Sequence, residues 1–335
     1  MHKDNFIEVS IGIIALNEEE YLPDLLDDIL NQTYDKQHME LVLVDSGSVD
    51  STLHIFEKFK LDNQAAYASI QILKNKGRNQ ASGWNTVIAN YTMDALIRID
   101  AHSRLTKDFV EQNVIALNKG EYVTGGLRSV VNKDSSNWDN TLWLAEMSLF
   151  GSSIASYRRA ESDCYVNSMF HACYRREVLN KVGFFNEKLG RTEDNEFHYR
   201  VRQDGYKLFY TPKIKSYQLI RSDLKKMVKQ KYGNGYWIGK TVYVCPKCLE
   251  IYHFIPFVFV IALFFTLLCS IFNFPYFLYT VAIAYGLFDI LNTGLCMRDE
   301  KFNITSLSLL FIFPLLHIAY GWGTIKGLLS GGIHE

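Results

Sequence analysis

The chain has 335 residues, with 35 Lys and Arg against 36 Asp and Glu, a formal net charge of -1. Nothing in this balance provides the basic surface of a nucleic-acid-binding protein, so we exclude that class first. Hydrophobic residues make up 48% and aromatic residues 14% of the chain, which is more than a soluble core requires and indicates membrane segments.

The first hundred residues alternate between short apolar runs and amphipathic stretches. Near-continuous apolar strands that alternate with helices predict a mostly parallel sheet covered on both faces. The fold class is therefore α/β. The expected strands are Val9–Ile14, Leu41–Val44, Ile70–Leu73 and Ala95–Asp100.

Polar residues follow each of these four strands. In an open parallel sheet, ligands bind beyond the carboxyl ends of the strands. Carboxylates there could bind a base and a ribose, an arginine could reach a phosphate, and an Asp-x-His pair could hold a divalent cation. One polar loop would indicate only solvent exposure, but four in succession predict a nucleotide site. The residues are Asn17, Glu18, Asp45, Gly77, Arg78, Asp100 and His102.

An acidic stretch later in the chain supplies a candidate base. Glu193 to Arg202 is predicted to form a helix, and Asp194 lies in its first turn. A carboxylate in this position could take a proton from an attacking hydroxyl. An ordinary acidic first helical turn is the alternative interpretation.

Three apolar segments close the chain, and each is near the roughly 20 residues that a membrane-spanning helix needs. They are His253–Phe272, Pro275–Met297 and Ile304–Ile325. Lysines precede the first segment, and Arg298 and Lys301 separate the second from the third, which predicts that the N-terminal region is cytoplasmic. Leu224–Tyr232 places apolar residues among lysines, a pattern typical of a helix at an anionic membrane surface.

Four ordered motifs resemble those of the family 2 glycosyltransferases with the GT-A fold, which is a Rossmann-like α/β fold. They are Ala15–Glu19, Leu43–Thr52, Asp100–His102 and Thr192–Asp194. Asp100–His102, Arg191–Glu196 and Gln230–Trp237 are also similar to the ExoA-like, membrane-anchored glycosyltransferases of exopolysaccharide biosynthesis. The resemblance covers nearly the whole chain.

The resemblance implies a role for each matching position. The donor, a nucleotide diphosphate sugar of the UDP type, would be bound by Asn17, Glu18, Asp45, Gly77, Arg78 and Asp100. Asp100 and His102 would match the metal motif for Mg or Mn, with His in place of the second Asp, which leaves open whether both bind the ion directly. Asp194 would be the general base. The acceptor would meet Glu193, Gln230, Tyr236 and Trp237.

The expected organisation follows the same order along the chain. Residues 1–104 form the nucleotide-sugar half and 105–220 the acceptor half of the GT-A domain; 221–250 form a membrane-interface segment, and 251–326 form three transmembrane helices. The expected activity is inverting transfer of a sugar to a hydroxyl of a lipid-linked, polyprenyl-type saccharide, in a multi-pass protein of the cell membrane. Other polysaccharide-assembly proteins are candidate partners. A catalytically silent nucleotide-sugar-binding partner and a nucleotidyltransferase are the alternatives.

Overall fold

The computed structural model describes residues 6–77, 79–131, 136–151, 160–219, 223–298 and 303–331. The chain divides into two compact units. The first consists of Met1–Ser129 and Ser156–Leu219, and the second of Val130–Ala155 and Ile220–Glu335. Each unit is described by itself.

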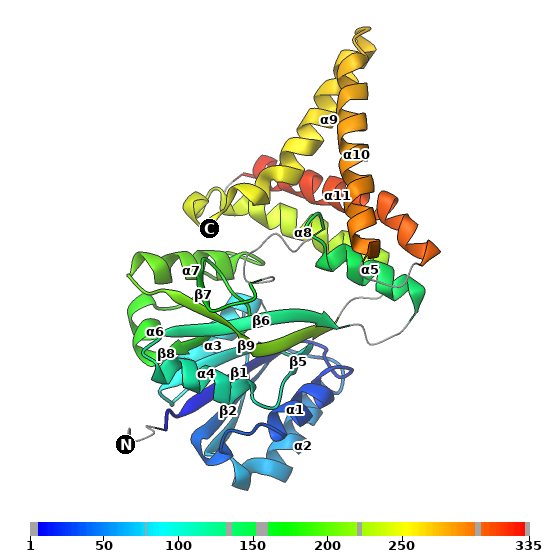
Figure 1. The fold of residues 1–335 in the computed structure, drawn as a ribbon. Coiled ribbons are helices and arrows are strands. Elements are labelled where there is room, and N and C mark those ends of the chain that lie inside the picture. The colour runs from blue at the N-terminus through cyan, green and yellow to red at the C-terminus, as the bar shows by residue number, and fades with distance from the viewer. Residues whose placement is uncertain are drawn as a thin grey trace. The chain divides into compact units, whose positions relative to one another are not determined.

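The parallel half of the first unit matches the sequence prediction. Its strands are β1 (Val9–Ala15), β2 (Met39–Asp45), β3 (Ser69–Lys74) and β4 (Ala95–Asp100), which run parallel in the order β3-β2-β1-β4 (Figure 1). The connections contain α1 (Leu22–Leu30), α2 (Thr52–Asn63) and α3 (Gln80–Asn90). The predicted alternation of strand and helix is confirmed here.

The other half of this sheet departs from the mostly parallel prediction. β8 (Cys173–Arg175) pairs antiparallel with β4, and the order continues through β6 (Val123–Val131) and β9 (Leu208–Leu219) to β5 (Ser103–Leu105). β7 (Cys164–Val166) pairs with β9. Helices α4 (Phe109–Asn118), α6 (Arg176–Val182) and α7 (Glu193–Gln203) complete the unit. The sheet is therefore mixed, with its parallel strands on one side.

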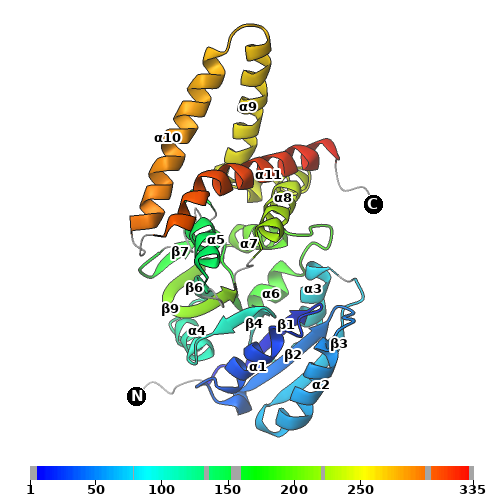
Figure 2. The same cartoon turned by 90° about the vertical axis from the view of Figure 1, so that its right-hand side faces the viewer.

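Two hydrophobic cores lie on the two faces of the sheet, because successive strand residues point to opposite faces. Ile11, Ile13 and Leu41 belong to the core that also contains side chains of α1, α2 and α4. Val44 and Leu96 belong to the other core, which contains side chains of α3, α6 and α7. Figure 2 shows α1 and α2 on one side of the parallel strands and α3 and α6 on the other. Helices on both faces leave the strand ends as the open edge of the sheet.

The second unit is helical. It contains α5 (Asn137–Met147), α8 (Leu224–Thr241), α9 (Ile255–Ile271), α10 (Tyr276–Arg298) and α11 (Leu309–Leu329). α9 and α10 form a long hairpin, and α11 lies along α8 (Figures 1 and 2). Within the described ranges, three segments are long and apolar enough to cross a membrane, namely Ile251–Ile271, Tyr276–Arg298 and Ile304–Leu329. They correspond to the three predicted apolar segments.

Candidate functional site

The register of the parallel strands aligns the acidic strand ends. Ala15 of β1 pairs with Asp45 of β2, and Ile14 of β1 pairs with Asp100 of β4. Asp45 and Asp100 thus occupy the carboxyl ends of the two strands that flank β1. The expectation that these two acids meet at one edge of the sheet agrees with this register.

The loops after β1 and β2 are joined by short polar bonds. Asn17 has a φ of 56° and its Oδ1 accepts a hydrogen bond from the Val49 amide at 2.9 Å. The Asn17 amide donates to Ser48 Oγ at 3.0 Å, and the Glu18 amide donates to Thr52 Oγ1 at 2.8 Å. Asn17 therefore fixes the loop beside the strand ends. The Glu18 carboxylate instead contacts His102, in the turn after β4.

The Asp45 carboxylate shapes the turn that follows it. Its Oδ2 accepts from the Gly47 amide and its Oδ1 from the Ser48 amide, both at 3.1 Å. Gly47 has a φ of 86°, a conformation that glycine adopts without strain. Each carboxylate oxygen keeps a further lone pair with which it could bind a ligand. The contact of Asp45 with a nucleoside stays a prediction.

The loop after β3 is tightly built around Gly77. The Gly77 amide donates to Asn75 Oδ1 at 3.1 Å, and a Cβ added at Gly77 would come within 2.6 Å of the Ser82 side chain. Asn79 caps α3 by accepting from the Ser82 amide at 2.7 Å. Arg78, the predicted phosphate ligand in this loop, lies outside the described residues.

β4 ends at Asp100, and Ala101 and His102 form a turn before β5 begins. The i and i+2 spacing of an extended segment therefore does not apply to Asp100 and His102. His102 Nδ1 instead lies 3.2 Å from Glu18 Oε1. Burial alone would lower the pKa of His102, but the hydrogen bond to Glu18 and the charge of Asp100 raise it overall. The turn thus brings the β1 and β4 loops together.

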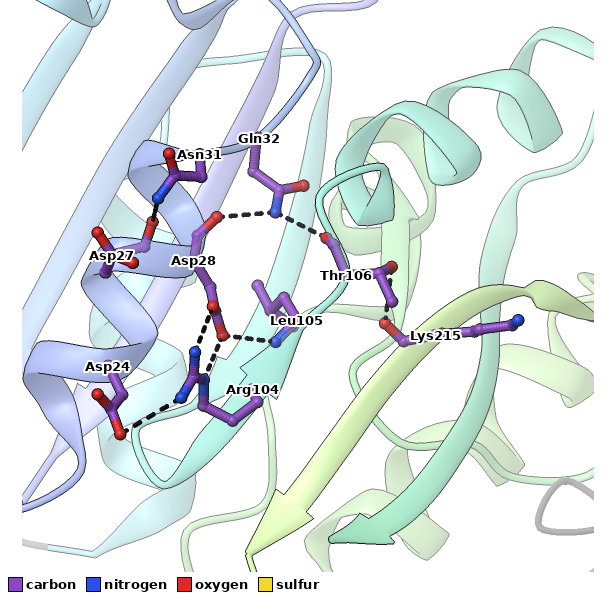
Figure 3. A network of polar contacts seen from close by, with 9 residues as sticks. All are labelled: Asp24, Asp27, Asp28, Asn31, Gln32, Arg104, Leu105, Thr106 and Lys215. Atoms are coloured by element: carbon purple, nitrogen blue, oxygen red, sulfur yellow. Dashed lines mark hydrogen bonds and ion pairs between the residues drawn. The ribbon is translucent and has the colours of Figure 1, made fainter. Parts of the chain in front are cut away.

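The residues after His102 are anchored to α1 (Figure 3). The Arg104 guanidinium donates to both oxygens of Asp28, at 2.6 and 2.8 Å, and the Leu105 amide donates to Asp28 Oδ2 at 2.9 Å. Gln32 Nε2 donates to the Thr106 carbonyl at 2.9 Å. A bidentate pair of this kind fixes both position and orientation, so the turn at His102 is held from its downstream side.

A buried histidine, His171, contacts both ends of the turn between Asp100 and Ser103. His171 is 5% exposed, and its Nε2 lies 3.3 Å from the Asp100 amide and 3.1 Å from Ser103 Oγ. Because the amide can only donate, Nε2 is the accepting nitrogen and the proton is on Nδ1. Burial, followed by the charge of Arg128, lowers the pKa of His171 well below its ordinary value, which keeps the ring neutral. Sequence reasoning missed His171, because no motif surrounds it.

Asp100 has the properties of a cation ligand. Its carboxylate makes no hydrogen bond or ion pair with any residue that the structure describes. Burial raises the pKa of Asp100, and the charges of His102 and Arg98 only partly oppose this. Within the described ranges no three His, Cys, Asp or Glu side chains form a ready-made metal centre. Such a carboxylate fits Mg²⁺, which binds through one or two carboxylates together with substrate phosphates.

Asp194 is brought to the same face of the sheet by an arginine that sequence reasoning missed. Arg98 Nη1 donates to Asp194 Oδ1 at 2.6 Å, and the Arg98 guanidinium lies 4.4 Å from the Trp84 ring centroid and 4.5 Å from that of Phe185. Arg98 precedes Asp100 by two residues in β4, so both point to one face. That alternation was the signal available in the sequence.

The first turn of α7 carries two acids in different environments. Glu193 is 2% exposed, and among the described residues its Oε2 has no hydrogen-bond partner. Burial, then the charge of Asp194, raises the pKa of Glu193 well above its usual range. Deeper in the helix, burial lowers the pKa of His198 to about 4. Both shifts favour the neutral forms of Glu193 and His198.

The remaining predicted residues lie on α8 in the second unit. Gln230, Tyr236 and Trp237 are all within this helix, and the Tyr236 and Trp237 rings meet edge to face with centroids 5.9 Å apart. Their acceptor role stays a prediction. A surface hollow of about 730 Å³ borders the Gly77 loop in the first unit, and Asp45, Asp100 and Asp194 are not among its lining residues.

Comparison with known proteins places this geometry in context. Residues 10–183 match the family Glycosyl transferase family 2. The chain is 28% identical over 331 residues, 98% of both chains, to the Dolichyl N-acetyl-alpha-D-glucosaminyl phosphate 3-beta-D-2,3-diacetamido-2,3-dideoxy-beta-D-glucuronosyltransferase of Methanococcus voltae. It is 26% identical over 230 residues, 67% of both chains, to the Succinoglycan biosynthesis protein ExoA of Rhizobium meliloti (strain 1021).

A solved structure shares the fold. The mannosyltransferase PcManGT from Pyrobaculum calidifontis, solved in complex with GDP-Man and Mn²⁺, aligns with 97% of this chain and 88% of its own, with a TM-score of 0.61 and 15% identity. The predicted GT-A fold is confirmed.

Proposed function

Because this chain belongs to glycosyltransferase family 2, we propose that it moves a sugar from a nucleotide diphosphate sugar to a hydroxyl of a lipid-linked saccharide, with inversion. The observation that carries this proposal is the alignment of Asp100 and Asp194 on one face of the sheet, linked through Arg98. One acid can serve the leaving group while the other serves the acceptor.

The donor would lie over the carboxyl ends of β1, β2 and β4. Glu18 and Asp45 would bind the nucleoside of a UDP-type donor, and Asn17 and Gly77 would shape the loops around it. Arg78 would reach the diphosphate. These roles rest on the positions of the loops and on the resemblance of their motifs to the family.

A divalent cation, Mg²⁺ or Mn²⁺, would supply charge to offset the departing diphosphate. Asp100 would hold it, and His102 would either bind it or orient its surroundings through Glu18. His171 would keep the Asp100 backbone in place by accepting a hydrogen bond from the Asp100 amide. This fits a cation whose coordination is completed by donor phosphates.

Asp194 would be the general base. Arg98 occupies its Oδ1, while its Oδ2 makes no hydrogen bond with the described residues and can accept a proton. The acceptor oxygen would bond to the anomeric carbon as the bond from that carbon to the diphosphate breaks, and the hydroxyl proton would pass to Asp194. A single displacement of this kind inverts the anomeric centre.

The acceptor assignment draws on the relatives. The Methanococcus voltae protein is named for a dolichyl-linked sugar phosphate, and ExoA for succinoglycan biosynthesis. Together with the candidate membrane segments, these names favour a lipid-linked acceptor, bound by Glu193 and by Gln230, Tyr236 and Trp237 of α8. The lysines before α9 and Arg298 favour a cytoplasmic first unit.

A donor screen on membranes that carry the protein tests this proposal. We expect release of a nucleoside diphosphate that stops with EDTA and with Asp100→Ala. Asp194→Asn is expected to lower turnover by about 100- to 10,000-fold while donor binding is retained. Asp204→Asn, which changes a carboxylate at the other end of the same helix, is the matched control for folding.

Three results would contradict the proposal in different ways. Normal turnover by Asp194→Asn would remove the base assignment. Donor binding without transfer to any lipid-linked acceptor would indicate a silent binding partner. Release of pyrophosphate in place of the nucleoside diphosphate would indicate a nucleotidyltransferase.

A further inference from the structure

The three apolar helices of the second unit differ in how they expose their side chains. Among the described residues, α9 buries only Thr266 and α10 only Asp289 and Thr293, so both present apolar groups around their circumference. α11 buries one whole side, and its exposed apolar residues follow one another at intervals of three, four or seven, beginning in the preceding turn. This stripe consists of Ile304, Leu307, Phe311, Leu315, Ile318, Trp322 and Leu329, and it also contains Lys326.

The buried side of α11 lies against α8 in backbone contact. A Cβ added at any of four glycines would overlap a carbonyl oxygen of the other helix. The facing pairs are Gly235 with Tyr320, Gly239 with Thr324, Gly323 with Tyr232, and Gly327 with Tyr236. Because the partners advance together along both helices, α8 and α11 run parallel and remain paired over most of α8. Any position of α11 in a membrane therefore carries α8 with it.

α8 is charged along its length. Lys225, Lys226 and Lys229 are exposed, and Lys231 is buried in a 2.8 Å ion pair with Glu146 of α5. Lys240 reaches the Gly331 carbonyl at 3.1 Å. The 18 residues of α8 extend over about 27 Å, close to the roughly 30 Å of a hydrocarbon core. If α11 crossed the membrane, these charges would be drawn into lipid, where a charged side chain near the centre of the bilayer is strongly unfavourable.

α11 contacts the hairpin away from its tip, in the first turns of α9 and in the middle of α10. Gly321 packs against Pro256 and Val260 in the first turns of α9, and His317 Nδ1 lies 2.8 Å from the Tyr285 hydroxyl of α10. Both views show α9 and α10 extending well past α11, which follows α8 instead (Figures 1 and 2). α11 therefore crosses the hairpin away from its tip and is not a third member of a spanning bundle.

From these observations we infer that α11 lies in the plane of the membrane surface, with its apolar stripe in the lipid, and that only α9 and α10 cross the bilayer. The occupant of the stripe is lipid because the stripe adjoins the all-round apolar surface of the hairpin, and because the charges of α8 lie on its other side. Two crossings return the chain to its starting side. The chain beyond α11 is then on the same side as α8, in contrast to the three crossings expected from the sequence.

Labelling of single cysteines in the full chain measures the sidedness. In a chain whose native cysteines are replaced by serine, Lys225→Cys, Asn273→Cys and Ser330→Cys mark α8, the hairpin tip and the end of α11. With a membrane-impermeant maleimide on intact cells, we expect the labels at 225 and 330 to behave alike and the label at 273 to behave oppositely. Opposite behaviour of 225 and 330 would show that α11 spans, whichever way the protein is oriented.

A reporter on the unaltered chain guards against misfolding of the cysteine-free variant. Green fluorescent protein or alkaline phosphatase fused after Glu335 reports which side the C-terminus occupies. We expect the same side as for a reporter fused before Met1. Reporters on opposite sides would overturn the inference.

The depth of the stripe in vesicles of phosphatidylcholine and phosphatidylglycerol distinguishes lipid from a second copy of the chain. Spin labels at Phe311, Leu315, Ile318 and Trp322 are expected to share one shallow depth, measured by collision with oxygen and a nickel chelate. Labels at Val258, Phe265 and Ile271 of α9 are the matched control and should pass through a maximum. A maximum along α11, or dipolar broadening between chains, would contradict lipid docking.

Discussion

Arg98 is a cation held between two aromatic rings and one carboxylate, with little water around it. Its side chain is 8% exposed, whereas that of Asp194 is 29% exposed. The rings of Trp84 and Phe185 fix the plane of the guanidinium, which in turn fixes Asp194. The placement of the proposed base therefore depends on β4 as much as on its own helix.

We expect Arg98→Met to lower kcat by about 100-fold with little change in KM for the donor, because a small displacement of a base is costly. Breaking the buried pair should also lower stability, by about 3–5 kcal/mol. Steady-state kinetics and thermal unfolding in detergent measure the two effects. Arg200→Met removes an ion pair to Glu196 within α7, the helix that carries Asp194, and is the control for an effect on stability alone. A rise in KM with unchanged kcat would exclude a positioning role.

Glu193 gives a dependence of stability on pH. Its pKa in the folded protein is raised above the ordinary value of 4.5, so the folded state holds its proton more tightly. The stability from this group is fully present below pH 4.5 and is lost as the pH rises through the raised pKa. We expect Glu193→Gln to flatten the fall in melting temperature toward alkaline pH, since glutamine stays neutral. Parallel profiles for the two proteins would show that Glu193 is ionised.

At the scale of elements, the pairing of α8 with α11 depends on glycines that allow the backbones to touch. Gly239 faces Thr324 and Leu328, whereas a Cβ at Gly286 of α10 meets nothing within 4 Å. We expect Gly239→Ala to lower the melting temperature, because overpacking of about 1–3 kcal/mol exceeds a helix-propensity gain of about 1 kcal/mol. Gly286→Ala should be neutral or stabilising. Equal effects of the two changes would refute close packing at Gly239.

The elements that the sequence predicts well are those with a long periodic signal. β4 begins and ends where the apolar run does, and α7 begins at Glu193 as predicted. β5, β7 and β8 have three residues each, too few to show an alternating pattern. β6 contains two glycines and β9 a proline, which weaken a strand signal. The antiparallel half of the sheet was therefore not predicted. Strand ends located Asp45 and Asp100, whereas His171 lies in an irregular segment and acts through a backbone contact that has no sequence signal.

The glycines of α8 are a second case in which a sequence pattern and the structure disagree. Gly235, Gly239, Lys240 and Thr241 resemble part of a phosphate-binding loop in composition. In the structure they are helical, and the glycines serve contact with α11. Composition alone cannot separate a glycine that approaches a phosphate from one that approaches another helix.

At the scale of the whole molecule, the proposed donor and base residues and the candidate membrane segments lie in different units. The proposed donor and base residues lie in the first unit, around the ends of its parallel strands. The second unit supplies the hairpin, α8 and α11, with their apolar and lysine-bearing surfaces. Such a division suits an enzyme whose donor is water-soluble and whose acceptor is anchored in lipid.

The route of the chain between the units limits how the protein can be rearranged. The chain leaves the first unit after Ser129, and α5 packs with α8 and α11 through Leu142 and Leu144. The chain then returns to complete the sheet. The membrane unit is thus partly an insertion and not a tail. Exchanging the second unit for that of another family member would need junctions at residues 129, 156 and 219 together. A single junction after the sheet would leave α5 without its packing partners in α8 and α11.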